Sequence, residues 1–182
     1  ATRMVEQLLS LARQEGTQIT PASACEIDAK AQCQRVLADM EPLARVRHIT
    51  LGAGALEAVH LRGHADGFGW MVRNLVENAI RYTPEGGQVR LSLRHASPNG
   101  GVDVCVEDSG PGIAPAERER VFDRFYRRPG QIESGTGLGL AIVRSIAERH
   151  GARLVLDTSP LGGLRVAVGF PALAAVTFGM II

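Results

Sequence analysis

Two alternating segments joined by a tight turn restrict the fold of this chain more than any other feature of its sequence. Residues 88–94 (Gln-Val-Arg-Leu-Ser-Leu-Arg) and 102–107 (Val-Asp-Val-Cys-Val-Glu) place an apolar side chain at every second position, as half-buried β-strands do. Pro-Asn-Gly-Gly at residues 98–101 separates them, and this arrangement predicts a β-hairpin. Because one face of the hairpin is apolar, a second layer has to cover it.

Helices supply that layer, because apolar residues recur at helical spacing in residues 22–47, 65–82 and 138–150. Pro42 lies inside the first of these segments, and we expect it to kink or end the helix. The pattern also predicts a short charged helix at residues 115–125 and short strands at 48–51, 58–62, 153–157 and 164–170. The predicted fold class is therefore α/β, a two-layer α/β sandwich with a mixed, mainly antiparallel sheet.

The first 15 residues form a separate helical pattern, with apolar side chains at Met4, Val5, Leu8, Leu9, Leu11 and Ala12. No capping residue precedes this pattern, so we expect the helix to begin upstream of the chain. The predicted organisation is a helix end at residues 1–16, a linker at 17–21 and one domain at 22–182. A length of 182 residues suits a single sizeable core.

Composition excludes several classes of protein. Lys30 is the only lysine, so no Gly-Lys-Ser/Thr phosphate loop can be written. The net charge of +1 and an aromatic content of 4% argue against a nucleic-acid binder. The longest uncharged stretch, residues 166–182, is too short for a membrane span and contains Pro171. The three cysteines lack the spacing of a zinc site or a disulfide framework.

The first segment that carries chemistry is Asn-Leu-Val-Glu-Asn-Ala-Ile-Arg-Tyr at residues 74–82. On a helix Asn74, Asn78 and Tyr82 share one face, with Glu77 and Arg81 beside it. A carboxamide oxygen is a neutral ligand that suits Mg²⁺. Taken alone, an asparagine on a helix is more often a solvated surface residue.

The second segment is Asp-Ser-Gly-Pro-Gly-Ile at residues 108–113, directly after a predicted strand. A carboxylate at Asp108 can accept a hydrogen bond from an exocyclic amine, and Gly110 and Gly112 would let a flat ring approach the backbone. An ordinary turn is the commoner explanation of such a segment on its own.

The third segment, residues 119–128, contains Phe122 and Phe125 among charged side chains. Five arginines lie between Arg118 and Arg128, and arginine stabilises the negative charge of a triphosphate. An exposed charged helix anchored by the two phenylalanines explains the segment equally well.

The fourth segment is Gly-Thr-Gly-Leu-Gly-Leu at residues 135–140, at the start of the predicted helix 138–150. Glycines at a helix N-terminus expose N–H groups that can bind phosphate. A loop precedes this segment instead of a strand, so the context of a Rossmann dinucleotide motif is missing.

In this order and spacing, the four segments resemble the N, G1, F and G2 boxes of sensor histidine kinases. The matching stretches are NLVENAIRYTP, DSGPGI, ERVFDRFYR and GTGLGLAIV. The resemblance covers about residues 22–171 and implies a Bergerat-type ATP-binding fold with ATP and Mg²⁺ as cofactors. Residues 3–13 resemble the end of the second helix of the family's dimerisation and histidine-phosphotransfer hairpin.

For the first box, the resemblance implies that Asn78 coordinates Mg²⁺ and that Asn74 supports the same polyphosphate site. Tyr82 would pack against adenine, and Arg81, where the family more often has lysine, would contact phosphate. Glu77 would orient or deprotonate the acceptor.

For the other boxes, the resemblance implies that Asp108 recognises the adenine amine in a pocket shaped by Gly110, Gly112 and Ile113. Residues 114–136 would form a mobile lid over the nucleotide. Further nucleotide contacts are implied for lid and helix residues: Phe125, Arg127, Thr136, Gly137, Leu138, Gly139 and Leu140.

The resemblance also implies partners that this chain does not supply. The family phosphorylates a histidine that an acidic residue follows at once, and no histidine of this chain has that neighbour: His48, His60, His64, His95 and His150. We therefore expect the acceptor on a hairpin upstream, a homodimeric parent protein and a response regulator as its partner. The parent is expected in the inner membrane, with this part in the cytoplasm and not touching the membrane.

Other members of the same fold stay open as alternatives. Chaperone, mismatch-repair and topoisomerase ATPases use a glutamate one helical turn before the magnesium asparagine, where this chain has Asn74, which cannot act as a general base. A serine kinase acting on anti-sigma partners and a pseudokinase that only binds ATP are the remaining alternatives.

Overall fold

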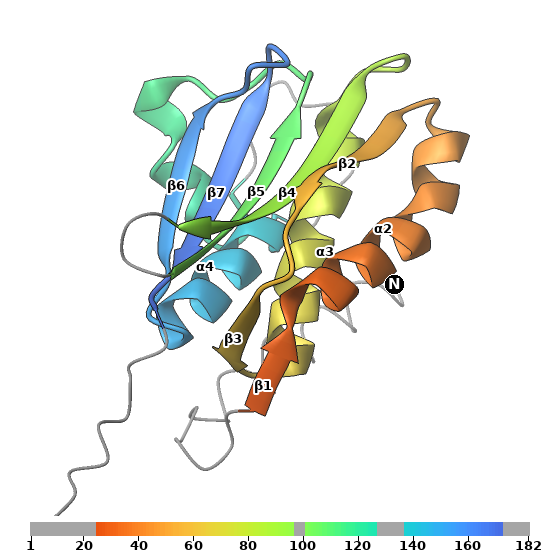
Figure 1. The fold of residues 1–182 in the computed structure, drawn as a ribbon. Helices are drawn as coiled ribbons and strands as arrows, with labels where there is room; N and C mark the ends of the chain where they lie inside the picture. Colours follow the sequence, from red (N-terminus) through yellow and green to blue (C-terminus); the bar gives the residue numbers. More distant parts are fainter. Residues whose placement is uncertain (1–24, 97–100, 127–136, 173–182) are drawn as a thin grey trace, which may run out of the picture.

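The computed structural model describes residues 25–96, 101–126 and 137–172. Five strands form one sheet in the order β2-β4-β5-β7-β6, and three helices cover one of its faces (Figure 1). The strands are β2 (Thr50–Leu56), β4 (Gln88–Ala96), β5 (Gly101–Asp108), β6 (Arg153–Thr158) and β7 (Leu164–Phe170). The helices are α2 (Ala29–Val46), α3 (Ala65–Tyr82) and α4 (Gly139–Arg149).

The sheet is mixed, as predicted. β2 pairs with β4 in parallel, while the β4–β5, β5–β7 and β6–β7 pairs are antiparallel. The predicted hairpin is the β4–β5 pair, with Leu91 opposite Val106 and Leu93 opposite Val104. All four of these side chains are buried. The two-layer α/β sandwich is therefore confirmed, and the alternation that predicted the hairpin reflects one buried face.

Helix α3 runs across the covered face of the sheet and packs against both α2 and α4. Its bounds are those predicted from the apolar spacing. Phe68, Met71, Val72, Val76 and Ile80 are fully buried. Burying a side chain of this size contributes about 1.5–3 kcal/mol, so α3 carries a large part of the core.

The predicted helix at residues 22–47 was wrong at its start. Cys25–Asp28 form strand β1, which pairs antiparallel with β3 (His60–Gly63) in a separate two-stranded sheet. The helix begins after Asp28, whose carboxylate accepts a hydrogen bond from Ala31 N at 2.9 Å. An aspartate in this position is a strong N-cap, so the helix start follows the cap and not the apolar spacing.

Pro42 does not end helix α2, which continues to Val46. Met40 and Ala44, on either side of the proline, are buried against the core. Their burial offsets the one backbone hydrogen bond that proline cannot make.

The predicted charged helix at residues 115–125 was also wrong. The segment forms two short 3₁₀ turns instead, η1 (Pro115–Glu117) and η2 (Arg120–Phe122). Val121 is the only buried side chain in these turns. Without an apolar stripe to bury, the segment gains little from forming a longer helix.

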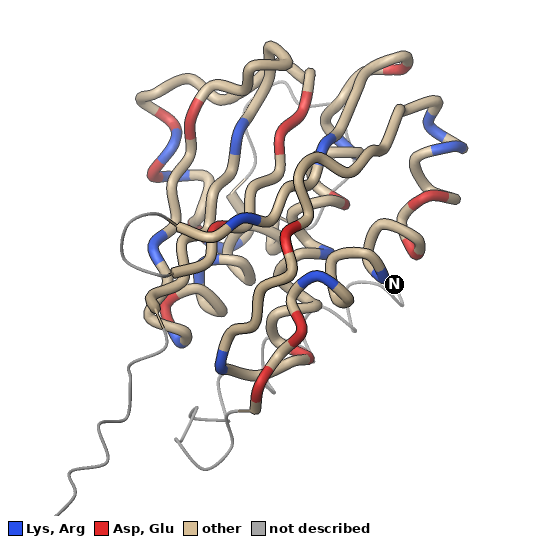
Figure 2. Tube along the Cα trace, viewed as in Figure 1, with Lys and Arg blue, Asp and Glu red and all other residues tan. Residues whose placement is uncertain are grey.

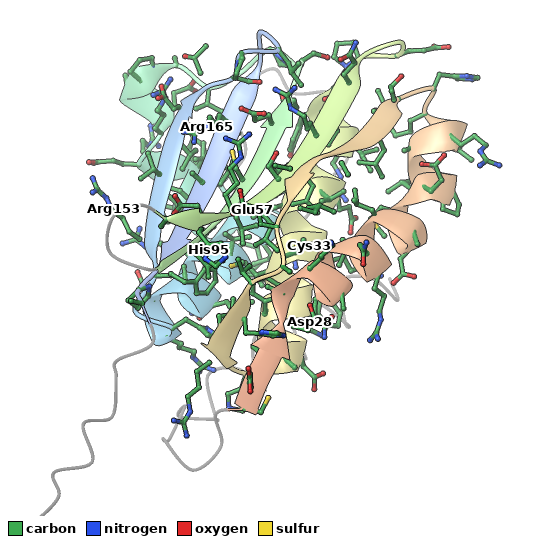
Figure 3. All side chains as sticks on the ribbon, in the orientation of Figure 1. Asp28, Cys33, Glu57, His95, Arg153 and Arg165 are labelled. Atoms are coloured by element: carbon green, nitrogen blue, oxygen red, sulfur yellow. The ribbon has the colours of Figure 1, made fainter. Side chains whose placement is uncertain are left out.

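The sheet face that the helices leave open carries charged side chains. Glu107 on β5 accepts a hydrogen bond from Arg90 Nε on β4 at 2.9 Å, and its carboxylate lies 3.8 Å from Arg165 Nε on β7. Arg165 and Arg153 are labelled on their strands in Figure 3. Acidic and basic residues are interspersed along the described part of the chain (Figure 2).

The N-terminal helix and the absence of a membrane span were also predicted from the sequence. The predicted helix and linker at residues 1–21 lie outside the described residues, so the domain boundaries stay predictions. Within the described ranges, none of the helices combines the length and apolarity needed to cross a bilayer.

His150 joins the end of α4 to the start of α3. Its Nδ1 lies 2.8 Å from Ile146 O, and its Nε2 accepts from His64 N at 3.2 Å. These two contacts require a neutral ring with the proton on Nδ1. Burial lowers the pKa of His150, which the hydrogen bond to Ile146 only partly opposes. The ring also packs edge-on against Phe170.

We predict that His150 makes stability pH-dependent. Because its pKa is lower in the folded protein, this contribution is complete above the unfolded pKa of about 6.5 and is lost as the pH falls below that value. Urea unfolding at pH 8 and pH 5 should show a smaller loss of stability at pH 5 in His150→Gln than in the parent. The exposed His95 provides the control, His95→Gln. An unchanged pH dependence in His150→Gln would contradict the assignment.

Candidate functional site

A pocket opens between α3, the segment that follows β5 and the start of α4. Its walls come from residues 74–166 of the chain, and one side is polar while the other is apolar. The residues that line it are Asn74, Leu75, Glu77, Asn78, Ala79, Arg81, Tyr82, Val106, Asp108, Gly112, Ile113, Val121, Tyr126, Gly137, Gly139, Leu140, Leu164 and Val166.

The polar wall is the face of α3 that the helical spacing predicted. Asn74, Asn78 and Tyr82 all line the pocket, because positions four residues apart lie above one another on a helix. Asn74 is only 5% exposed, and its Nδ2 donates to Trp70 O at 2.8 Å. This bond orients the carboxamide, so the oxygen of Asn74 is left as an acceptor.

Glu77 and Arg81 form an ion pair at the same wall. Arg81 Nη2 donates to Glu77 Oε1 at 2.7 Å, and the side chains are 18% and 13% exposed for Arg81 and Glu77 respectively. A pair this short and this buried holds both side chains in place. The pocket therefore contains a carboxylate and a guanidinium whose positions depend on each other.

Asp108 stands at the end of β5 with its carboxylate in the pocket. Its Oδ1 accepts from Gly110 N at 2.8 Å and from Leu164 N at 3.0 Å. The residue is 6% exposed, and burial raises the pKa of the carboxyl, an effect that the two N–H donors only partly oppose. These donors favour the ionised form that can accept a further hydrogen bond. Gly110 thus serves through its N–H, and it does not line the pocket.

The glycine-rich segment meets the polar wall at the start of α4. Gly137, Gly139 and Leu140 line the pocket. A Cβ added at Gly139 would lie 2.7 Å from Nδ2 and 2.9 Å from Oδ1 of Asn78. A glycine is therefore needed for the start of the helix to approach the Asn78 carboxamide. The side chain of Leu138 is fully buried in the core, so only its backbone can reach a ligand.

The third segment contributes a different aromatic residue from the one predicted. Phe125 is 58% exposed and lies outside the pocket, whereas the next residue, Tyr126, lines it. Arg120 lies 4.9 Å from the centre of the Tyr126 ring, and Tyr126 OH donates to Glu117 Oε1 at 3.5 Å. Phe125 has a φ of +63°, which turns its side chain away from the direction that an extended backbone would give.

Two predicted site residues, Arg127 and Thr136, lie outside the described residues. Residues 127–136 of the predicted lid lie outside the described residues as well, whereas residues 114–126 of it are described.

The apolar wall was largely missed by the motifs. It consists of Leu75, Ala79, Val106, Ile113, Val121, Leu164 and Val166, of which only Ile113 was predicted. Val106 could have been predicted, because it lies two residues before Asp108 on β5 and therefore on the same face of that strand. Val166 lies opposite Val106 in the β5–β7 register, and no local pattern predicts that pairing.

The pocket suits a nucleotide. The apolar wall can take a flat ring, and Asp108 can accept from an amine at its edge. The polar wall offers carboxamide oxygens beside the start of α4, where no side chain caps the helix. Among the described residues, no group of three or more His, Cys, Asp or Glu side chains could hold a metal. Mg²⁺ does not require one, because it binds through few protein oxygens together with phosphates and water.

Arg118 ties the segment that carries Ile113 to the edge of the sheet. Its Nε donates to Ile113 O at 3.3 Å, and its Nη1 donates to Leu156 O on the edge strand β6 at 3.1 Å. Its Nη2 also lies 3.3 Å from Thr158 Oγ1. One guanidinium thus fixes a wall of the pocket and satisfies a carbonyl of an edge strand.

Comparisons with known proteins identify the family. Residues 63–174 match the family described as histidine kinase-, DNA gyrase B-, and HSP90-like ATPase. The chain is 37% identical over 180 residues to the sensor protein IrlS of Burkholderia pseudomallei (strain K96243). The aligned region covers 96% of this chain and 37% of that protein. The chain therefore spans about a third of the length of such relatives.

Solved structures of histidine kinases are similar as well. Full-length ShkA in complex with AMPPNP has a TM-score of 0.78 and 27% identity over 95% of this chain and 36% of that one. The cytoplasmic segment of histidine kinase QseC has a TM-score of 0.62 and 26% identity, over 94% of this chain and 93% of that one.

We predict that Arg118→Ala lowers the free energy of unfolding by about 1–2 kcal/mol, because two partly buried carbonyls lose their donor. Arg45→Ala is the matched control, since its 3.5 Å pair with Glu41 is exposed, and it should cost less than about 0.5 kcal/mol. Urea titration measures both values. Equal losses in the two variants would mean that the Arg118 contacts to β6 carry no weight.

Proposed function

Since this chain belongs to the histidine kinase-, DNA gyrase B- and HSP90-like ATPase family and contains the ATP-binding catalytic domain of a sensor histidine kinase, we propose that its parent protein transfers the γ-phosphoryl group of ATP to a histidine. The observation that carries this proposal is the pocket that brings Asn78, Asp108 and Gly139 together from three separate segments.

Adenine would be bound at the apolar wall. The Asp108 carboxylate accepts from the exocyclic amine, while Val106, Ile113 and Val166 contact the ring. Tyr82 would pack against the same base from the end of α3. Gly112 would leave room for the ring at this end of the pocket, and Gly110 would act through the N–H that it donates to Asp108.

The phosphates would lie between α3 and the start of α4. N–H groups of residues 137–140 would favour negative charge in this region, because they stand at the positive end of α4. Asn78 would hold Mg²⁺ with support from Asn74. Bound Mg²⁺ neutralises charge on the phosphate oxygens during transfer. Arg81 would contact a phosphate while keeping its bond to Glu77.

Glu77 would act on the acceptor. Its carboxylate lines the pocket and is oriented by Arg81, so it can accept a hydrogen bond from the N–H of an incoming imidazole. That bond would direct the other ring nitrogen, with its lone pair, towards the γ-phosphorus. The same carboxylate could take the imidazole proton as the transfer proceeds.

An ATP hydrolase of the same fold is less well supported. Those enzymes need a general base to activate water, and the position in question is Asn74 in this chain. Its carboxamide cannot accept a proton, and its Nδ2 is already bonded to Trp70 O. The proposal therefore favours transfer to a histidine over transfer to water.

The partners are proposed from the family alone. The acceptor histidine would lie on a dimerisation and phosphotransfer hairpin of the same protein, and the phosphoryl group would pass to a response-regulator aspartate. The parent is proposed to be a homodimer in the inner membrane with this chain in its cytoplasmic part, which is consistent with the likeness to the cytoplasmic segment of QseC.

We predict that Mg²⁺-ATP binding depends on Asn78. Asn78→Ala removes one protein oxygen from the metal, so affinity for Mg²⁺-ATP should fall at least about tenfold. In EDTA the unmutated chain and the variant should bind ATP with similar affinity. Arg73→Ala, on the same helix and outside the pocket, should bind like the parent. Calorimetric titration that finds an unchanged Mg²⁺-ATP affinity in Asn78→Ala would contradict the metal assignment.

We also predict that the unmutated chain prefers ATP to GTP at least about tenfold. Asp108 faces an amine in adenine and a carbonyl in guanine, and two facing acceptors cost about 1–3 kcal/mol. In Asp108→Asn the preference should weaken, because the carboxamide can donate to the guanine carbonyl. Competition binding with the two nucleotides measures the ratio, and equal affinities in the parent would refute the base assignment.

Phosphoryl transfer needs the acceptor close to the donor, so this chain alone should bind ATP without forming phosphohistidine. Incubation with γ-labelled ATP and a separately produced hairpin of the parent should label the hairpin. The label should be stable in alkali and labile in acid. Alkali-stable label on this chain alone would mean that one of its own five histidines is the acceptor.

A further inference from the structure

The turn between β6 and β7 lies directly against Asp108, although 50 or more residues separate them in the chain. Gly163 N donates to Asp108 O at 3.1 Å, and Leu164 N donates to Asp108 Oδ1 at 3.0 Å. The turn is closed by its own bonds, from Ser159 N to Gly163 O at 2.9 Å and from Leu161 N to Ser159 Oγ at 3.0 Å. Ser159 is itself buried. The turn is therefore a rigid support for the carboxylate.

Gly163 is the residue that allows this approach. A Cβ at this position would lie 2.1 Å from Asp108 Oδ1 and 2.4 Å from Gly110 N. Both neighbours belong to the β5 end of the pocket, where a carboxylate and a backbone N–H have little room to move. Unlike Gly162, Gly163 has no left-handed φ, so its requirement is for space and not for backbone conformation.

Only one oxygen of the Asp108 carboxylate is available to a ligand. Oδ1 accepts two backbone N–H groups, from Gly110 and Leu164, and these occupy both of its lone pairs. Among the described residues, no hydrogen bond reaches Oδ2. Because the side chain is nearly buried and lines the pocket, the carboxylate cannot turn freely, and Oδ2 is the one acceptor left for a ligand.

We propose that the β6–β7 turn, through Gly163, is a positioning element that sets base selectivity by presenting Oδ2 of Asp108 as a single fixed acceptor to the exocyclic amine of the base. This inference rests on the proposed binding of ATP. It adds a residue that lies in none of the four motifs and that acts only through Asp108.

The experiment compares ATP with the triphosphate of purine riboside, which lacks the 6-amino group. The ratio of their affinities measures the contact between the amine and Asp108. We expect a ratio of about ten in the parent, which corresponds to about 1.4 kcal/mol, and a ratio below about three in Gly163→Ala. Affinity for purine riboside triphosphate itself should change much less.

Two other variants separate positioning from general damage. Gly169→Ala adds a methyl group on β7 at 3.0 Å from Asp103 Oδ1, outside the pocket, and should keep the ratio of the parent. Ser159→Ala removes the hydroxyl that accepts a hydrogen bond from Leu161 N and adds no clash. This variant should reduce the ratio of the two affinities at least about twofold. Thermal unfolding of each variant establishes that affinities refer to folded protein.

The outcomes distinguish this inference from the proposed function. No binding of ATP by the parent would overturn the proposed function. Binding of ATP with an unchanged ratio in Gly163→Ala would overturn the role of the turn alone. Binding of ATP without any distinction between the two nucleotides by the unmutated chain would overturn both this role and the proposed contact of Asp108 with the amine. If Gly163→Ala does not fold, Ser159→Ala decides, and a parent-like ratio in that variant would refute the inference.

Discussion

Helix α3 has one face in the core and the other in the pocket, so the burial of its apolar side decides where the site stands. Phe68, Met71 and Ile80 are fully enclosed between the sheet and the neighbouring helices. Residues on a helix are rotated by about 100° from one to the next. A slip of a single residue would therefore expose this core and turn Asn74 and Asn78 away from the pocket. Packing of the core and geometry of the site are one constraint.

Among the described residues, three buried polar side chains near the pocket are held in place by hydrogen bonds. Thr83 Oγ1 donates to Ala79 O at 2.7 Å, Asn74 is bonded to Trp70 O, and Asp108 accepts two backbone N–H groups. An unpaired buried group of this kind would cost about 1–3 kcal/mol. The same bonds that avoid this cost also orient the side chains before any ligand arrives, which lowers the cost of ordering them upon binding.

Much of the fold could be predicted from the sequence because its elements follow local patterns. Alternation identified the β4–β5 hairpin, and apolar spacing identified α3 at its observed bounds. The errors came from interactions that compete with spacing. Asp28 capped α2 later than its apolar pattern began, burial on both sides of Pro42 kept that helix intact, and residues 115–125 lacked an apolar face to hold a helix.

By itself, the sequence determined the elements and the chemistry available on each of them. Asn74, Asn78 and Tyr82 share a helix face, and Asp108 ends a strand, wherever those elements are placed. Only the tertiary structure decided that these groups meet in one pocket, that Tyr126 and not Phe125 lines it, and that Gly163 lies against Asp108. The reason is physical: such contacts depend on strand register and on the packing of the whole core, and neither is contained in the periodicity of a short segment.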